Sequence, residues 1–383
     1  METVKGFKDF MGEEAEKRAI VTEIIRQTFE KYGFQPVETP IVEYEEFVQG
    51  KNSNDDAVRD IFRLQDRGKR KLALRYEFTF QLKRIAENQK LPFRRYQIGP
   101  NFRDEPIRPG RTRQFTQCDV DVVGSTLKDE AENISMINEI MKTLKIDSIT
   151  YINNRRLMNE ILEEEKIKEK DSIIREIDKL DKLSKFEVKK NLEKYNAGYL
   201  VDLFTKPEEY YKKYKSYKEV EELKKYCALF GTKVEFRPFL ARGLSYYNEM
   251  VIEVWSKELP VSILGGGSYM VGKNQSTGIS FGIEPLMLLT KLKFNLEKFL
   301  VVSLNQDKKA IQLSKQLRKQ GKNTSIYFGK PNKALAYANA YKFTKVIFVG
   351  EKEVEKKMFK IKNLETGKEV TLTLTKPKAT SKS

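Results

Sequence analysis

The chain has 383 residues, of which 39% are hydrophobic, with 72 basic against 55 acidic side chains and a formal net charge of +17. This length predicts two or three domains, the apolar content excludes a disordered chain, and the basic surplus indicates a polyanionic partner such as nucleic acid or an anionic surface. Histidine is absent and only two cysteines occur, which excludes imidazole-based catalysis, zinc sites and a disulfide framework and leaves Arg, Lys, carboxylates, Tyr or an oxygen-bound metal for any chemistry.

The first 150 residues combine helical spacing of apolar residues with extended segments. Pro36 and Pro40 end the first helix and favour an extended backbone around them. The predicted elements are a helix at 14–32, an extended segment at 34–42, a hairpin at 61–75, a helix at 78–88 and strands at 94–103 and 115–123.

The pattern changes twice in the rest of the chain. Residues 151–230 are dense in Lys and Glu with periodic Ile, Leu and Tyr, which predicts mixed-charge helices. Extended sequence runs from Val234 through a predicted turn at Gly265-Gly266-Gly267 to Phe281, and a helix follows around 286–289. From residue 298, short apolar runs alternate with amphipathic stretches in the order βαβαβ, which predicts an open α/β domain.

The positive charge is concentrated at the C-terminal end. Residues 298–383 carry 19 Lys and one Arg against one Asp and five Glu, which is +14 of the total +17. This suits an RNA-docking module, and the alternative is a lysine-rich solvated surface of a thermophilic composition. No run of about 18 apolar residues and no hydrophobic signal region occur, so we expect a soluble, cytoplasmic protein without a membrane partner.

The two strands at 94–103 and 115–123 carry the strongest local signal for chemistry. In a strand, Gln117, Asp119 and Asp121 share one face because side chains alternate with period two. Arg103 and Glu105 share a face in the same way, and an arginine-rich loop with Arg108, Arg111 and Arg113 joins the strands. Such a loop suits a nucleoside triphosphate and an RNA co-substrate, and the alternative is a plain RNA-binding or solvated loop.

The order of short motifs along the chain is more specific than any one of them. The motifs lie at 6–10 (GFKDF), 39–43 (TPIVE), 74–79 (LRYEFT), 102–105 (FRDE), 110–119 (GRTRQFTQCD), 241–248 (ARGLSYYN), 264–269 (LGGGSY) and 278–284 (GISFGIE). In this order they resemble histidyl-tRNA synthetase, a class II aminoacyl-tRNA synthetase, over nearly the whole chain. The sequence Gln117-Cys118-Asp119 resembles that of the archaeal and eukaryotic branch.

The resemblance implies an α+β class II catalytic core, in which helices flank an antiparallel six-stranded sheet, with a helical insertion and a C-terminal α/β anticodon-binding domain. The helix and the Pro40 segment resemble motif 1, which implies a homodimer. The implied parts are the first part of the core at 1–150, the insertion at 151–232, the second part of the core at 233–296, the anticodon-binding domain at 298–375 and a polar tail at 376–383.

The resemblance also implies roles for individual residues. The implied histidine-binding residues are Glu77, Thr79, Gln117, Asp121, Tyr247 and Tyr269. The implied ATP-binding residues are Arg103, Glu105, Arg111 and Arg113, and the implied catalytic pair is Arg242 with Arg103. From local pattern alone, an alternative for Tyr246 and Tyr247 is strand packing. The three glycines at 265–267 are consistent with a plain turn, a bulge or close approach of the backbone to a ligand.

The implied function is ATP-dependent activation of L-histidine to histidyl-adenylate and its transfer to the 3′ end of tRNA(His). ATP and Mg²⁺ take part, and no metal ligand in the chain is assigned. The attacking carboxylate is already an anion, so the reaction requires positioning and charge stabilisation and no protein base. The absence of histidine is therefore compatible with this enzyme.

Three places depart from the family pattern. Ser268 and Met270 replace an Arg and an Asp, Pro285 replaces the Arg of motif 3, and Ser245 replaces an Asp. The motif 3 substitution is expected to weaken ATP binding, unless another cation takes over the role of the missing arginine. The alternative function is a catalytically silent paralogue that binds tRNA or histidine as a sensor or regulatory subunit. The enzyme is favoured because the arginines of motif 2 and Arg242 are kept.

Overall fold

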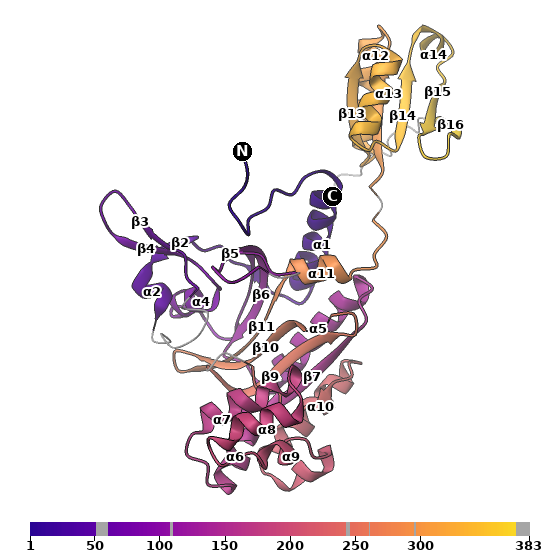
Figure 1. The fold of residues 1–383 in the computed structure, drawn as a ribbon. Helices are drawn as coiled ribbons and strands as arrows, with labels where there is room; N and C mark the ends of the chain where they lie inside the picture. The colour runs from indigo at the N-terminus through magenta and orange to yellow at the C-terminus, as the bar shows by residue number, and fades with distance from the viewer. Residues whose placement is uncertain (51–59, 108–109, 243–245, 260, 295, 373–383) are drawn as a thin grey trace. The chain divides into compact units, whose positions relative to one another are not determined.

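The computed structural model describes residues 1–50, 60–107, 110–242, 246–259, 261–294 and 296–372 (Figure 1). The chain divides into two compact units. The larger unit contains Met1–Asp9 and Arg18–Leu292, and the smaller contains Phe10–Lys17 and Lys293–Ser383.

An eight-stranded sheet forms the centre of the larger unit, in the order β1-β5-β6-β11-β10-β9-β7-β8. Its strands are β1 (Gln35–Pro36), β5 (Phe93–Phe102), β6 (Gln114–Val123), β7 (Ser148–Asn154), β8 (Glu235–Phe236), β9 (Tyr247–Ser256), β10 (Ser262–Val271) and β11 (Asn274–Gly282). The six inner strands pair antiparallel, and the short strands β1 and β8 pair parallel at the two edges. The predicted six-stranded antiparallel sheet is therefore confirmed, with a short strand added at each edge.

Helices α1 (Gly12–Lys31), α5 (Leu127–Thr143) and α11 (Ile283–Leu289) contribute to the apolar layer of the unit. Within the larger unit, the Phe29 ring of α1 lies 6.2 Å from the Phe281 ring of β11, and α5 also packs on β11. Cys118, Val120 and Val122 of β6 are fully buried. The alternation predicted for this strand therefore leaves Gln117, Asp119 and Asp121 on its other face.

A small three-stranded sheet precedes the central strands in sequence. It contains β2 (Val42–Tyr44), β3 (Arg63–Gln65) and β4 (Lys71–Leu74), with helices α2 (Glu45–Gln49) and α4 (Thr79–Ala86) nearby. Strands β3 and β4 form an antiparallel pair, as the hairpin prediction required. Backbone contacts tie this region to the end of β5, because Phe102 N donates to Arg75 O at 3.0 Å.

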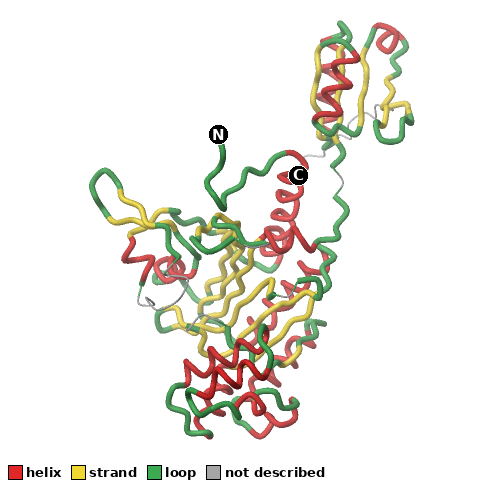
Figure 2. The backbone as a smooth tube through the Cα atoms, in the orientation of Figure 1, coloured by secondary structure: helices red, strands yellow, loops and turns green. Residues whose placement is uncertain are grey.

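The helical insertion follows β7 and forms a cluster of helices at one end of the sheet (Figure 2). It comprises α6 (Arg155–Glu164), α7 (Lys170–Ile177), the 3₁₀ helix η1 (Asp178–Asp181), α8 (Lys185–Glu193), α9 (Leu200–Leu203), η2 (Glu208–Lys213) and α10 (Tyr217–Leu229). Strand β7 pairs with β9 in the central sheet, so the boundary placed between residues 150 and 151 falls inside a core strand. The helices begin at Arg155.

The predicted turn at Gly265–Gly267 is wrong. These glycines lie inside β10, paired with β11 on one side and β9 on the other. The register with β9 shifts between Gly267 and Tyr269, so the pairing is irregular there. Pairing on both sides outweighs the local preference of a glycine triplet for a turn, and the missing side chains create space on the sheet.

The smaller unit is an α/β domain with the sheet order β13-β12-β14-β15-β16. Its elements are β12 (Lys298–Ser303), α12 (Asp307–Lys319), β13 (Asn323–Phe328), α13 (Pro331–Ala340), β14 (Lys345–Val349), α14 (Glu351–Glu355), β15 (Phe359–Asn363) and β16 (Glu369–Leu372). Successive residues of β12 enter two cores, with Leu313 of α12 on one face and Ala334 of α13 on the other. The β15–β16 hairpin was not predicted, and the polar tail lies outside the described residues.

Candidate active site

The polar face of β6 forms the floor of a buried site. Gln117 Nε2 donates to Asp119 Oδ1 and to Ser280 Oγ, both at 2.8 Å, and its Oε1 accepts from Asn101 Nδ2 at 3.0 Å. The antiparallel register places Arg95 of β5 directly opposite Asp121. Arg95 is 1% exposed, and its Nη2 lies 2.6 Å from Asp121 Oδ2. A buried arginine therefore compensates part of the negative charge on this floor.

Asp121 also links the floor to β10. Tyr269 OH donates to Asp121 Oδ1, so both oxygens of this carboxylate have a partner within the site. Gly278 of β11 lies beside it, and a Cβ at that position would overlap Asp121 Oδ1. The site thus requires glycine at residue 278, because no side chain fits next to the carboxylate.

Glu77 lies in the segment between β4 and α4, and Thr79 is the first residue of α4. Arg75, which is 4% exposed, fixes this segment through Nη1 donating to Thr39 O at 2.7 Å and Nε donating to Pro100 O at 3.0 Å. Burial raises the pKa of Glu77 to about 7, although Arg103 acts in the opposite direction. A buried carboxyl with this pKa is readily ionised by a cationic ligand.

Both carboxyl groups on the β6 floor, Asp119 and Asp121, also have a raised pKa. Burial raises the pKa of Asp119 to about 6, with Arg95 lowering it and Asp121 raising it. Glu77, Asp119 and Asp121 are thus three buried carboxyl groups, and the buried Arg95 is paired with Asp121. Because the negative groups outnumber the buried cation, the site favours a ligand that carries an ammonium group.

Three tyrosines line the site beside these carboxyl groups. The Tyr246 ring lies 4.8 Å from the Tyr247 ring and 5.5 Å from the Tyr269 ring. Burial raises the pKa of Tyr246 and Tyr269 well above the usual value for a phenol. Their hydroxyl groups therefore stay protonated, and because Tyr269 already donates to Asp121, its oxygen is left to accept a hydrogen bond from a ligand.

Arg242 approaches the sheet where a glycine makes room. Its Nη1 lies 3.1 Å from Glu253 Oε1, and a Cβ on Gly265 would overlap the same nitrogen. The Arg242 guanidinium lies 5.8 Å from the centre of the Tyr247 ring, and burial raises the pKa of Tyr247 while Arg242 lowers it and Glu77 raises it. Arg242 thus borders the site formed by Glu77 and the tyrosines.

The motif 2 residues lie where the β5–β6 hairpin leaves the sheet. Arg103 Nε donates to Tyr76 O at 3.1 Å, and its guanidinium lies 5.2 Å from the centre of the Phe115 ring. Arg111 Nη1 lies 3.2 Å from Glu105 Oε2, and Arg113 Nη2 lies 3.0 Å from Asp104 Oδ1. Arg111 is largely exposed, and Arg108 lies outside the described residues.

Two of the departures from the family pattern are explained by their position. Ser268 is fully buried on the side of β10 opposite Tyr269, where its hydroxyl donates to Glu130 of α5. The missing arginine at this position therefore removes no cation from the tyrosine-lined site. Pro285 lies in the first turn of α11, where proline is compatible with a helix. Ser245 lies outside the described residues.

Several site residues were missed by the sequence argument. Arg95 could have been predicted. Side chains alternate along a strand, so residue 95 lies on the same face as Arg103 when the pattern is extended toward the start of the predicted strand. Tyr246 was weighed only as packing. Glu253 had no local signal, because its role depends on pairing between β9 and β10. Among the described residues, no group of three or more His, Cys, Asp or Glu side chains is placed to hold a metal ion.

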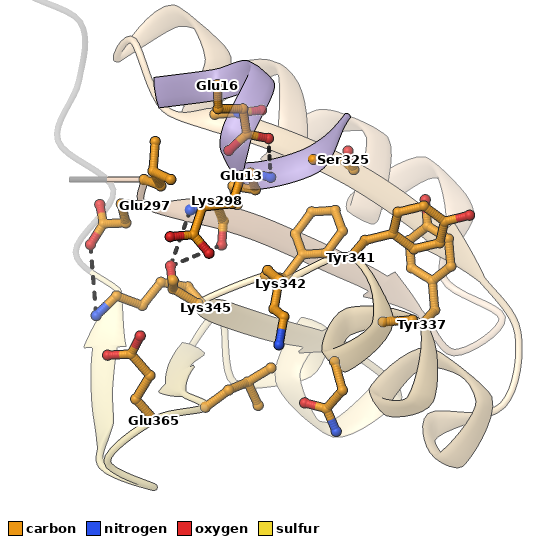
Figure 3. Close-up of a pocket in the computed structure, with 18 of the residues that line it drawn as sticks. Glu13, Glu16, Glu297, Lys298, Ser325, Tyr337, Tyr341, Lys342, Lys345 and Glu365 are labelled. Atoms are coloured by element: carbon orange, nitrogen blue, oxygen red, sulfur yellow. Dashed lines mark hydrogen bonds and ion pairs between the residues drawn. The ribbon is translucent and has the colours of Figure 1, made fainter. Parts of the chain in front are cut away.

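The smaller unit carries a cavity of a different kind, with a volume of about 1040 Å³ (Figure 3). Tyr337 and Tyr341 lie at one end of it, with ring centroids 4.6 Å apart. Lys345 and Glu297 lie at the other end, where their charged atoms are 3.7 Å apart. Lys342, which follows Tyr341 in the chain, also lines the cavity, and aromatic rings with a neighbouring lysine form a surface suited to nucleotides.

Comparison with known proteins agrees with the geometry. The family model described as histidyl-tRNA synthetase matches residues 6–286, and the one described as anticodon binding domain matches residues 298–379. The chain belongs to the histidyl-tRNA synthetase family. Within this family it is 32% identical to histidine–tRNA ligase 1 of Bacillus cereus, over 98% of this chain and 95% of that protein. It is also 32% identical to the histidine–tRNA ligase of Pyrococcus horikoshii, over 98% and 97%.

Solved structures show the same fold. The histidyl-tRNA synthetase of Nostoc superposes with a TM-score of 0.85 at 26% identity, over 97% of this chain and 96% of that one. A protein of Bacillus halodurans titled ATP phosphoribosyltransferase regulatory subunit/histidyl-tRNA synthetase has a TM-score of 0.76 at 19% identity, over 91% and 97%. The second likeness concerns the fold alone. No helix in the described ranges has the length and apolar character needed to cross a membrane.

Proposed function

We propose that this chain is a histidine–tRNA ligase, which activates L-histidine with ATP and transfers it to the 3′ end of tRNA(His). The observation that carries the proposal is the buried group of Glu77, Asp119 and Asp121 with Arg103 and Arg242 at its border. The carboxyl groups suit the ammonium of an amino acid, and the arginines suit a phosphate group. Full-length similarity to histidine–tRNA ligases supports the same function.

In this proposal the substrate histidine lies on the β6 face. Glu77 and Thr79 hold its α-amino group, Gln117 and Asp121 complete the pocket, and the hydroxyl groups of Tyr247 and Tyr269 lie around its imidazole. The support is their common burial in one site, with Asp121 already joined to Tyr269. The raised pKa of Glu77 fits this role, because a bound ammonium would favour its ionised form.

ATP would lie across the β5–β6 hairpin. Arg103 and Arg242 would hold the α-phosphate from two sides, Glu105 would accept from the adenine amine, and Arg111 and Arg113 would contact ATP and the end of the tRNA. Mg²⁺ would arrive with ATP and be held mainly by phosphate oxygens.

The chain's own residues would position the reactants and stabilise charge. The histidine carboxylate attacks the α-phosphorus, the bond to the β-phosphate oxygen breaks, and pyrophosphate leaves. Arg103 and Arg242 stabilise the negative charge that develops on the α-phosphate oxygens, and no side chain has to accept a proton. The terminal ribose hydroxyl of tRNA then displaces AMP from the adenylate.

The remaining parts of the proposal concern partners and origin. The basic smaller unit would bind tRNA, supported by Tyr337, Tyr341 and Lys342 in its cavity. The proposed homodimer would form through α1 and the Pro40 segment. The cytoplasmic location and the likeness to the archaeal and eukaryotic branch stay predictions, since similar relatives come from both bacteria and an archaeon.

The decisive experiment is ATP–pyrophosphate exchange by the purified, tag-free protein with each of the twenty amino acids. Exchange stimulated by histidine alone, followed by charging of tRNA(His), is the expected result. If the protein binds histidine or tRNA and catalyses no exchange, the catalytically silent paralogue replaces the enzyme as the best account.

A further inference from the structure

The backbone of Arg242 has an unusual conformation. Its φ angle is +62°, which lies in the left-handed region that residues other than glycine rarely occupy. A long side chain keeps such a conformation only when surrounding contacts hold it, and residues of this kind are concentrated at functional sites. The contacts around Arg242 therefore identify what places this guanidinium.

One side chain of the helical insertion holds this backbone. Asp178 Oδ1 accepts hydrogen bonds from Ala241 N at 2.9 Å and from Arg242 N at 3.0 Å. Both donors are main-chain groups. The carboxylate therefore fixes the backbone conformation, and the guanidinium can bind other partners. Asp178 is the first residue of η1 and directly follows α7.

The position of Asp178 is itself fixed from two directions. Ile173, Ile174 and Ile177 of α7 are buried in the insertion. At the other end of η1, Asp181 Oδ1 lies 2.7 Å from Arg237 Nη1, and the Arg237 guanidinium lies 3.3 Å from the centre of the Tyr151 ring of β7. The η1 turn is thus anchored both in the helices and on the central sheet.

The guanidinium of Arg242 has its own support on the sheet. Glu253 Oε1 lies 3.1 Å from Arg242 Nη1, and Glu253 Oε2 accepts from Trp255 Nε1 at 2.9 Å. Gly265 leaves the space that the guanidinium occupies. The sheet therefore fixes the tip of the side chain, while the insertion fixes its backbone.

We propose that Asp178 is a positioning residue, through which the helical insertion holds the backbone of Arg242 in the left-handed conformation needed for its role at the α-phosphate. The inference rests on the proposed function and extends it, because it makes amino-acid activation depend on a part of the chain that does not itself contact the substrates. Asp178 acts through its hydrogen-bond acceptor, and its charge is secondary.

The test compares Asp178→Ala and Asp178→Asn in the full-length protein. Asparagine keeps a carbonyl oxygen that can accept both N–H groups, whereas alanine removes it. In histidine-dependent ATP–pyrophosphate exchange, we expect Asp178→Ala to lower kcat at least tenfold while the KM values for ATP and histidine change less than threefold. Asp178→Asn is expected to recover most of the lost kcat.

A matched control and a second measurement complete the design. Asp171→Ala removes another insertion carboxylate, which pairs with Arg155 at 2.7 Å, and is expected to leave exchange unchanged. Hydrogen–deuterium exchange of the Ala241 and Arg242 amides is expected to be faster in Asp178→Ala than in the wild type or Asp178→Asn. This second measurement does not depend on catalysis.

The outcomes separate the inference from the proposed function. If the wild type catalyses pyrophosphate exchange and Asp178→Ala is equally active, the inference is overturned and the proposed function remains. An Asp178→Asn variant as impaired as Asp178→Ala overturns the acceptor role. If the wild type itself catalyses no exchange, the proposed function fails, and unchanged protection of the two amides in Asp178→Ala would overturn the inference as well.

Discussion

Four arginines of the larger unit differ in how deeply they are buried and in the groups that they contact. Arg95 is buried on the β6 floor against Asp121, and Arg75 is buried where it holds main-chain oxygens. Arg103 and Arg242 have partly exposed side chains at the border of the site. The buried arginines therefore stabilise the site, and the accessible ones are available to a phosphate group.

The first prediction concerns Arg242→Ala. We expect the rate of histidine-dependent pyrophosphate exchange to fall on the order of 10³-fold, because the variant loses one of the two groups proposed to stabilise charge at the α-phosphate. The fold should survive, since Glu253 can take up a proton: burial raises its pKa already, and Arg242 opposes that rise. Exchange kinetics and thermal unfolding measure the two effects.

The control for this variant is Arg63→Ala, which removes a half-exposed arginine paired with Glu45 at 2.7 Å. A surface pair of this kind contributes little to stability, so both activity and unfolding should match the wild type. Unchanged exchange by Arg242→Ala would refute the role of this arginine.

The second prediction concerns Pro285→Arg, which restores the residue usual in motif 3. Position 285 lies in the first turn of α11, where arginine is as acceptable as proline. A charge-assisted contact to ATP is expected to lower the KM for ATP about tenfold, equivalent to about 1.4 kcal/mol. The KM for histidine is the internal control and should stay the same. An unchanged KM for ATP would mean that another cation already performs this task.

Strand β10 contributes side chains to polar contacts on both faces of the sheet. Tyr269 points to Asp121 in the active site, and the neighbouring Ser268 points to Glu130 of α5 on the other side. Glu130 is 2% exposed, and its Oε2 has no hydrogen-bond partner among the described residues. Burial raises the pKa of Glu130 to about 8, with the Ser268 hydroxyl lowering it.

The third prediction follows from this carboxyl group. Because its pKa rises from 4.5 in the unfolded chain to about 8 in the folded one, the folded state binds a proton that the unfolded state has released between these values. The free energy of unfolding should therefore fall as the pH rises through this interval, by about 1.4 kcal/mol per pH unit from this group. Urea unfolding at pH 5, 6, 7 and 8 measures the slope.

Glu130→Gln isolates the contribution of this residue from those of Glu77 and Asp119, whose pKa values are also raised. Glutamine keeps the oxygen that accepts from Ser268 and cannot ionise. The variant should show a shallower decline of stability with pH than the wild type. Parallel pH dependences in the two proteins would contradict the assignment.

The two units of the molecule differ strongly in net charge. Residues 298–383 hold +14 of the net charge of +17, whereas the buried candidate active site lies in the larger unit. We therefore expect long-range attraction to a polyanion to come mainly from the smaller unit, and amino-acid activation to depend on the larger one.

The fourth prediction is that deletion of residues 298–383 separates these activities. Binding of tRNA should weaken and depend less steeply on salt concentration, because fewer phosphate contacts release fewer counterions. Histidine-dependent pyrophosphate exchange should persist. Binding titrations at several salt concentrations measure the slope, and a truncated protein with the full-length slope would rule out the smaller unit as the main RNA-binding surface.

The sequence by itself determined what depends on neighbouring residues. Period two along residues 115–123 separated Gln117, Asp119 and Asp121 from the apolar Cys118, Val120 and Val122. The polar contacts that Gln117 and Asp121 make on their face agree with that division. The ordered motifs identified the family, and hydrophobic spacing predicted the βαβαβ order of the smaller unit. These features were predictable because alternation and helical periodicity are properties of the local backbone.

Only the tertiary structure decided which distant residues meet. The pairing of Arg95 with Asp121, of Ser268 with Glu130 and of Asp178 with the backbone of Arg242 depends on strand register and on the packing of helices against the sheet. The same pairing placed the three glycines inside β10 instead of a turn. A local pattern gives the face on which a side chain lies, but its partner is set by packing across the whole unit, because each strand's register is fixed by its neighbours.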